Sequence, residues 1–179
     1  MTIYLIRHGK TDANELRLYC GSTDLSLSES GREELRRIRY DISGVRFLTS
    51  GMARANETMK LLFPGIPYEI DPRFREVDFG AFEMRSYEQL KDNPAYQTWL
   101  TGDNESNVPP GGESGQQMTE RVLSAFADIR TDTCIVTHGG VIAAIMAAMF
   151  PQEGKHRYQW QPKNGCGYAI TDDSFEPIP

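Results

Sequence analysis

The chain has little cysteine and no long apolar run, and each shortage excludes a class of protein. The three cysteines (Cys20, Cys134 and Cys166) are odd in number and lack a C-x-x-C spacing, so the sequence indicates neither a disulfide framework nor a zinc knuckle. We expect reduced thiols and a cytoplasmic protein. The longest apolar run, 141–150, is too short to cross a bilayer, and no secretion signal precedes the first predicted strand, so we expect no membrane partner.

Positive charge is also in short supply. The sequence has 19 Lys and Arg against 25 Asp and Glu, a net charge of −6, which argues against nucleic acid as a partner. An anionic ligand therefore needs a local positive pocket in an acidic body. The length of 179 residues suits a single domain, 1–179, which buries roughly two thirds of its unfolded surface.

What the chain does contain is an alternation of strand and helix patterns. Short apolar runs predict strands at 2–7, 45–49, 68–70, 134–137 and 166–171. Helical apolar spacing and capping residues predict helices at 28–42, 52–62, 86–91, 94–100, 114–130 and 139–150, with a polar loop at 101–112. The alternation predicts an α/β fold, a three-layer α/β/α sandwich around a mostly parallel central sheet.

Three short segments follow predicted strands, at the carboxyl ends where α/β sheets bind ligands. Arg7 and His8 end the first strand, and His138 opens a helix whose N-terminus favours an anion. Arg54 lies in the first turn of a helix, an unfavourable place for a cation unless it faces an anion. Taken singly, these residues could be structural histidines and surface arginines. Together they indicate two histidines and two arginines that one phosphate pocket can collect.

These segments belong to an ordered series of motifs that runs from residue 2 to about 171. The series is IYLIRHGKTDAN at 3–14, LSLSESG at 25–31, TSGMARANET at 49–58, FREVDFGAFE at 74–83, PGGES at 110–114 and VTHGG at 136–140. In this order the motifs resemble those of the histidine phosphatase superfamily, in its phosphoglycerate mutase-like branch. The resemblance implies a phosphoglycerate mutase-like fold and a phosphomonoester hydrolase.

Position by position, the resemblance implies a set of catalytic roles. His8 attacks phosphorus in line and becomes a phosphohistidine. Arg7, Arg54 and His138 bind the phosphoryl oxygens, with His138 protonated once phosphate is bound. Glu76 protonates the leaving alkoxide and then activates water against the phosphohistidine. The resemblance implies no metal ion and no cofactor.

Further phosphate or substrate contacts are implied at Asn14, Glu83 and Glu113 and at the backbone of Gly139. For the two carboxylates, a role in orienting arginines or in lining the rim stays open. Lys10 stands where acidic residues or glutamine are common in the family, a departure that concerns substrate preference.

Among the hydrolases of this superfamily, the chain looks most like α-ribazole phosphatase-like proteins, through 79–85, 96–100 and 164–170. Those proteins remove the 5′-phosphate from α-ribazole phosphate in cobalamin biosynthesis. The resemblance implies a small phosphorylated metabolite as substrate, with 71–112 as a substrate-facing cap. Three aromatic residues of this cap could stack on a flat base or, at helical spacing, belong to a core; they are Tyr87, Tyr96 and Trp99.

Two alternatives stay open. A cofactor-dependent phosphoglycerate mutase would share the motifs, although the chain lacks the long insertions that shield the phosphohistidine from water in those enzymes. A catalytically inactive module that binds a phosphorylated ligand would share the pocket. The third histidine, His156, lies outside every motif, and we expect it on the surface. No pattern indicates the oligomeric state.

Overall fold

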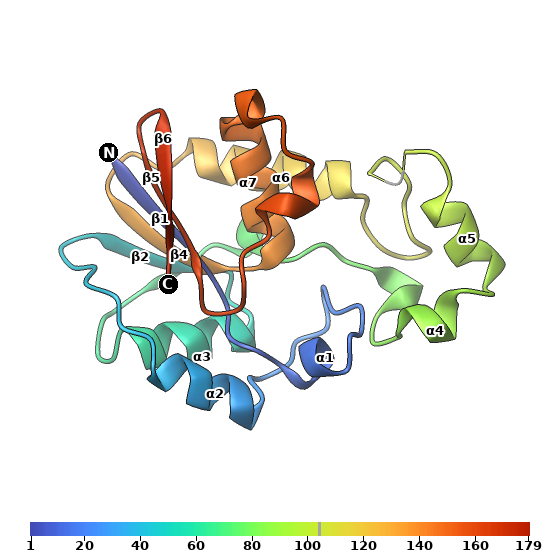
Figure 1. Ribbon diagram of the computed structural model, residues 1–179, viewed down its shortest axis with the longest axis horizontal. Helices are drawn as coiled ribbons and strands as arrows, with labels where there is room; N and C mark the ends of the chain where they lie inside the picture. The colour runs from blue at the N-terminus through green and yellow to red at the C-terminus, as the bar shows by residue number, and fades with distance from the viewer. Residues whose placement is uncertain (104) are drawn as a thin grey trace.

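The described part of the chain forms a mixed six-stranded sheet in the computed structural model, which covers residues 1–103 and 105–179 (Figure 1). The strands are β1 (Thr2–Arg7), β2 (Arg46–Thr49), β3 (Glu69–Ile70), β4 (Thr133–Thr137), β5 (Gly167–Thr171) and β6 (Ser174–Ile178). Their order across the sheet is β3-β2-β4-β1-β5-β6. Position 104, inside the predicted polar loop 101–112, lies outside the described residues.

Strands β1 to β4 are parallel, and the sheet ends in an antiparallel pair. β4 pairs in parallel with both β1 and β2, and β2 with β3, whereas β5 pairs antiparallel with β1 and β6. The prediction of a mostly parallel sheet is therefore confirmed. The prediction that 166–171 is the last strand is wrong. β6 follows it as a short, largely exposed edge strand, and Pro177 in it is a residue that edge strands tolerate.

Helices cover both faces of the sheet, with α2 and α3 on one face and α6 and α7 on the other (Figure 1). The α-helices are α1 (Asp12–Glu15), α2 (Glu29–Arg36), α3 (Ala53–Leu62), α4 (Tyr87–Leu90), α5 (Pro94–Leu100), α6 (Gly115–Ala127) and α7 (Gly139–Met149). Short 3-10 turns are η1 (Pro72–Phe74), η2 (Gly80–Phe82), η3 (Pro151–Glu153) and η4 (Arg157–Trp160). The three predicted layers are present. Among the described residues, no helix is long and apolar enough to cross a bilayer.

Alternate residues of β4 contribute to two separate cores. Ile135 packs with α6 and α7, whereas Cys134 and Val136 pack with α3 on the other face. A parallel strand covered on both faces is largely apolar, which explains the unbroken apolar run at 134–136. α7 is apolar nearly all round and has Ile142 fully buried, as its sequence predicted.

Two helices are shorter than the sequence predicted. Ser28 caps α2 by accepting a hydrogen bond from Gly31 N, but the helix ends at Arg36 rather than near Ile42. Ile42 and Ile38 lie beyond the helix and are still half-buried, so their apolar spacing reflects contact with the core and not a continued helix. α6 likewise ends before residue 130.

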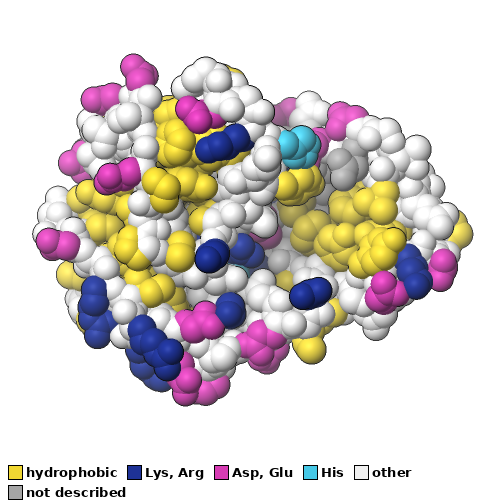
Figure 2. Space-filling view, in the orientation of Figure 1, with side chains coloured by type: hydrophobic (Ala, Val, Ile, Leu, Met, Phe, Trp, Pro, Cys, Tyr) yellow, Lys and Arg dark blue, Asp and Glu magenta, His cyan; other side chains and the backbone are white. Residues whose placement is uncertain are grey.

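Helices α4 and α5 form a lobe beside the sheet, at the right of Figure 1. Phe82 and Tyr96 are 1% exposed and belong to its core, with Tyr19 and Trp99 packed against them. Tyr96 therefore belongs to the core, whereas Tyr87 is exposed. Figure 2 shows a hollow between the lobe and the rest of the molecule, with hydrophobic side chains on the lobe's side.

Candidate active site

The carboxyl ends of β1 and β4 place two histidines side by side. Arg7 pairs with Thr137 across the two strands, and His8 N donates to Thr137 O at 2.9 Å, so both chain segments leave the sheet together. The ring centroids of His8 and His138 are 5.1 Å apart, and the two residues are 5% and 0% exposed. The sequence placed both histidines at strand ends, and the structure brings them into one buried pair.

Among the described residues, His8 has a hydrogen-bond partner for one ring nitrogen and none for the other. Nδ1 lies 2.7 Å from the carbonyl oxygen of Gly9, and because a carbonyl oxygen only accepts, Nδ1 carries the proton. Burial, followed by the charges of Arg54 and Arg7, holds the pKa of His8 well below its ordinary value of 6.5. The ring is therefore neutral near pH 7, with the Nε2 lone pair available for attack.

His138 is bonded through both ring nitrogens. Arg54 Nε donates to Nδ1 at 3.3 Å, which leaves Nε2 as the protonated nitrogen that donates to Ser50 Oγ at 2.8 Å. Burial and the charge of Arg54 hold the pKa of His138 well below 6.5. Two neutral histidines thus lie beside cationic arginines, an electrostatic environment that attracts an anion.

Arg54 is buried, at 1% exposure, despite its charge. Nη1 donates to Thr23 O at 2.8 Å and Nη2 to Gly21 O at 2.7 Å. Together with the bond to His138, these contacts use three of the five guanidinium donors within the described residues. One N–H on each terminal nitrogen remains for an oxygen of a bound phosphate, which would also offset the unfavourable position of this cation at the start of α3.

Arg7 supplies a second guanidinium to the same site. Its Nη1 donates to Pro162 O at 2.8 Å, while its Nε is buried and has no partner among the described residues. A buried donor without an acceptor costs free energy. Burial lowers the pKa of Arg7, and the nearby charge of Glu76 opposes that shift. These contacts indicate an anion site between the arginines and close to Glu76.

Glu76 lies on the N-terminus of α7. Its Oε2 accepts a hydrogen bond from Gly140 N at 2.9 Å, and its Oε1 accepts one from Val77 N at 3.0 Å. A Cβ atom at position 140 would lie 2.4 Å from Glu76 Oε1, so this close approach requires glycine. The carboxylate is thereby fixed beside the turn that carries His138.

A cavity extends from Glu76 toward the lobe, and its walls combine aromatic and charged side chains. Tyr19, Phe79, Trp99 and Tyr158 line it. Across its rim Arg157 forms an ion pair with Glu105. A second hollow is lined by Arg7 and Lys10, and Gln161 lines both hollows. The groups predicted to bind phosphate and the cavity with aromatic side chains are therefore neighbours, an arrangement suited to a phosphoester with an organic leaving group.

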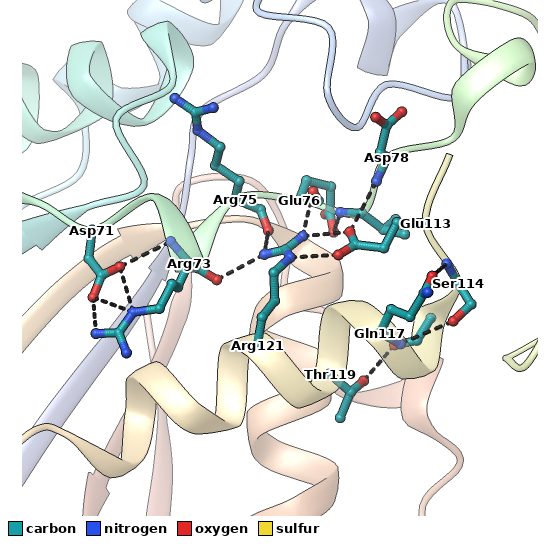
Figure 3. Close-up of polar contacts among 12 residues, drawn as sticks. Asp71, Arg73, Arg75, Glu76, Asp78, Glu113, Ser114, Gln117, Thr119 and Arg121 are labelled. Atoms are coloured by element: carbon teal, nitrogen blue, oxygen red, sulfur yellow. Dashed lines mark hydrogen bonds and ion pairs between the residues drawn. The ribbon is translucent and has the colours of Figure 1, made fainter. Parts of the chain in front are cut away.

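Arg121, from α6, holds the backbone that carries Glu76 (Figure 3). Its Nη1 donates to the carbonyl oxygens of Arg73 and Arg75, at 2.8 and 2.7 Å. Its Nη2 donates to the carbonyl oxygen of Glu76 at 3.0 Å. Glu113 accepts two bonds from the same guanidinium, from Nε and Nη2, both at 2.7 Å.

The two further carboxylates of the predicted site hold other groups. Glu83 accepts hydrogen bonds from the N–H groups of Gly21, Ser22, Thr23 and Phe79 and from the Thr23 hydroxyl. It holds the loop whose carbonyls bind Arg54, while Glu113 is paired with Arg121. Both fit the alternative of orienting arginines.

The structure also places the other positions that the sequence analysis named. Asn14 accepts from Thr11 N at 3.0 Å, and Asn164 Nδ2 lies 3.5 Å from the same oxygen, beside its bond to the His8 carbonyl. Gly139 is the first residue of α7. Lys10 pairs with Glu34. His156 is exposed, as expected.

Sequence reasoning missed four residues of the site: Ser50, Thr58, Arg121 and Gln161. Thr58 Oγ1 accepts from Gly9 N at 2.9 Å and fixes the turn after His8. Ser50 and Thr58 lie in the quoted motif 49–58, which was the one available signal. Arg121 binds a carbonyl distant in sequence, and Gln161 lines hollows formed by residues distant in sequence, which no local pattern marks.

The described part of the chain has no evident metal site. No group of three or more His, Cys, Asp or Glu side chains there could hold a metal ion. The three cysteines are free, with Cys134 buried in the core and Cys20 and Cys166 half-buried.

Comparison with known proteins gives consistent matches. The family model of the histidine phosphatase superfamily (branch 1) matches residues 3–176. The adenosylcobalamin/alpha-ribazole phosphatase of Salmonella typhimurium is 33% identical over 187 residues, covering 95% of this chain and 90% of that protein. A structure from Escherichia coli K-12, provisionally described as an alpha-ribazole-5′-P phosphatase, matches with a TM-score of 0.86 at 27% identity, over 99% of this chain and 94% of that one.

A third match carries a different activity in its description. The structure of a phosphoglycerate mutase from Thermus thermophilus matches with a TM-score of 0.78 at 30% identity, over 95% of this chain and 92% of that one. The predicted phosphoglycerate mutase-like fold is therefore confirmed. The chain belongs to the histidine phosphatase superfamily, branch 1, and is an enzyme of this family of phosphomonoester hydrolases.

Proposed function

We propose that the protein hydrolyses a small phosphomonoester through a phosphohistidine on His8, without a metal ion. One observation carries the proposal: the buried, neutral His8 donates Nδ1–H to the Gly9 carbonyl, which leaves Nε2 unprotonated beside two arginines. This is the protonation state that a nucleophilic imidazole requires.

In the first step Nε2 of His8 attacks phosphorus and the bond between phosphorus and the leaving oxygen breaks. Arg7, Arg54 and a protonated His138 stabilise the charge on the phosphoryl oxygens. Glu76, entering as the carboxylic acid, gives its proton to the leaving alkoxide. The products of this step are the free alcohol, phosphohistidine and the Glu76 carboxylate.

In the second step a water molecule attacks the phosphohistidine. The Glu76 carboxylate takes one proton from the water as its oxygen bonds to phosphorus, and the bond between phosphorus and Nε2 breaks. Inorganic phosphate leaves, His8 returns to the neutral form, and Glu76 is again protonated for the next cycle.

For the substrate we propose α-ribazole 5′-phosphate or a similar small metabolite in the cytoplasm. The relatives from Salmonella typhimurium and Escherichia coli carry that substrate in their names. The cavity beside Glu76 supports the proposal, because its walls include Trp99 and Tyr158, aromatic side chains on which a flat leaving group can stack. In this proposal the segment 71–112 is the substrate-facing cap, with Phe79 and Trp99 on the cavity wall.

Chemical trapping tests the phosphohistidine. Wild-type protein quenched during turnover of p-nitrophenyl phosphate should carry phosphate that is labile in acid and stable in base, and His8→Ala should carry none. Activity should survive a chelator. Full activity in His8→Ala would contradict the mechanism, and a wild type that binds phosphate without turnover would support the inactive binding module instead.

A screen of phosphomonoesters tests the proposed substrate. α-Ribazole 5′-phosphate should exceed sugar phosphates, nucleotides and 3-phosphoglycerate in kcat/KM. The match to a Thermus thermophilus phosphoglycerate mutase makes one comparison decisive. Faster, bisphosphoglycerate-dependent interconversion of phosphoglycerates than hydrolysis of any monoester would identify the protein as a mutase.

A further inference from the structure

Arg121 donates all of its N–H groups to the backbone of the Glu76 segment and to one carboxylate (Figure 3). A guanidinium has five N–H donors. Three of them bind backbone carbonyls between residues 73 and 76, and two bind Glu113. Within the described residues none is left for a substrate, so Arg121 is not placed to bind phosphate itself.

The three carbonyls that Arg121 binds have no other donor in the backbone. No backbone N–H of the described residues bonds the carbonyl oxygens of Arg73, Arg75 or Glu76. These three carbonyls therefore take no part in the hydrogen bonds of a helix or strand, and a side chain from α6 binds them, while Thr137 Oγ1 binds the Phe74 carbonyl between them. Because the Glu76 carbonyl is among the three, Arg121 fixes the very residue whose carboxylate reaches Gly140.

We propose that Arg121 is a positioning residue for Glu76, and that Glu113 holds Arg121 in place. Glu113 meets Nε and Nη2 with its two oxygens, a bidentate geometry that fixes the guanidinium plane. Both side chains are largely buried, at 26% and 20% exposure, so solvent screens the pair less than a surface ion pair. The inference rests on the proposed role of Glu76 as acid and base.

If Arg121 positions Glu76, the effect of changing Arg121 on hydrolysis depends on the leaving group of the ester. An ester with a poor leaving group, such as an alkyl phosphate, needs a correctly placed acid, whereas 2,4-dinitrophenyl phosphate does not. Hydrolysis of the phosphohistidine needs the same carboxylate as base for either ester. A displaced Glu76 therefore slows alkyl ester cleavage and lets phosphohistidine accumulate from the dinitrophenyl ester.

The test compares Arg121→Lys and Arg121→Met with Glu76→Gln. Lysine keeps the charge but offers three donors from a single nitrogen, so it cannot replace the five contacts. For the alkyl ester kcat/KM should fall roughly 10²-fold, the size of effect that a 1 Å misplacement can have. For the dinitrophenyl ester kcat/KM should stay within about threefold, with a burst of product and trapped phosphohistidine. Arg73→Lys, which changes the two ion pairs of an exposed side chain on the same segment, with Asp71 and Asp128, is the matched control and should leave the hydrolysis of both esters unaffected.

Several results would overturn the inference. An equal loss for both esters in the Arg121 variants would mean a purely structural role, and no loss for either would mean no role. If these variants do not fold, Glu113→Gln gives the same test, since it loosens the guanidinium without removing it. If Glu76→Gln lacks the leaving-group dependence, the proposed acid role fails first; if only the Arg121 variants lack it, the positioning role alone fails.

Discussion

At the scale of single residues, the site depends on which nitrogen of each histidine carries the proton. The Gly9 carbonyl keeps the proton on Nδ1 of His8, and Arg54 Nε keeps it off Nδ1 of His138. The free protein therefore holds His8, the proposed nucleophile, with Nε2 unprotonated, and a second imidazole whose Nδ1 can gain a proton once a bound phosphate takes over the Arg54 Nε–H donor.

Phosphate binding is expected to protonate His138. An anion beside the ring favours the charged form, which the free site disfavours through burial and through Arg54. In an NMR pH titration the pKa of His138 should rise when inorganic phosphate saturates the site. A titration curve that is identical with and without bound phosphate would contradict this charge arrangement.

Gly140→Ala should lower activity without lowering stability. The added methyl carbon would lie 2.4 Å from Glu76 Oε1 and displace the carboxylate. We expect kcat/KM for alkyl phosphates to fall roughly 10²-fold, while the free energy of unfolding stays equal or rises by up to about 1 kcal/mol, because alanine favours a helix over glycine. Steady-state kinetics and urea unfolding measure the two. The matched control is Ala148→Gly, in the exposed part of α7. It should leave kcat/KM unchanged and lower the free energy of unfolding by up to about 1 kcal/mol.

At the scale of elements, loops without regular structure are held by charged side chains. Glu83 gathers N–H donors from Gly21, Ser22 and Thr23, and the carbonyls of this loop bind Arg54. A Cβ atom on Gly21 would lie 1.6 Å from the Val77 carbonyl oxygen, so the loop packs directly against the backbone beside Glu76. The two halves of the site are thus built on touching loops.

Glu83→Gln should weaken substrate binding. The amide has one acceptor oxygen where the carboxylate has two, so some of the loop's N–H groups lose their partner, at about 1–3 kcal/mol for each group left buried. We expect KM for phosphomonoesters to rise about tenfold as the carbonyls that hold Arg54 shift. Glu88→Gln, at an exposed position of α4, is the control. Unchanged KM in Glu83→Gln would show that the loop keeps its form without this carboxylate.

The elements that could be predicted are those with local signals. The apolar runs of β1, β2 and β4 mark buried strands, and residues directly after them, such as His8 and His138, follow from the rule for strand ends. Other features depend on distant partners. β6 is recognisable only through its pairing with β5, and Arg121 binds carbonyls 45 to 48 positions earlier in the chain. The end of α2 was missed because Ile38 and Ile42 face the core from a loop at helical spacing.

At the scale of the whole molecule, the two buried histidines couple stability to pH. Their pKa values are lowered in the folded protein, whereas the unfolded chain titrates near 6.5. Below that pH the unfolded state binds protons that the folded state does not, so stability falls as pH falls. The loss is at most about 1.4 kcal/mol per pH unit for each histidine.

This linkage gives a measurable prediction. Urea unfolding without phosphate should show a decline in the free energy of unfolding between about pH 6.5 and 5, above the range where carboxylates with lowered pKa values such as Asp71 are protonated. His138→Asn should reduce the slope of that decline with pH, whatever its effect on the free energy of unfolding at a single pH. Equal slopes for variant and wild type would mean that His138 titrates alike in both states.

The position of β4 has a consequence for synthesis on the ribosome. β4 lies between β1 and β2, although its residues follow theirs by more than eighty positions. A nascent chain that ends before Thr133 therefore has two strands without their shared neighbour and His8 without the second histidine of the pair. The last quarter of the chain completes both the sheet and the pocket, so folding and activity should appear together, late in translation.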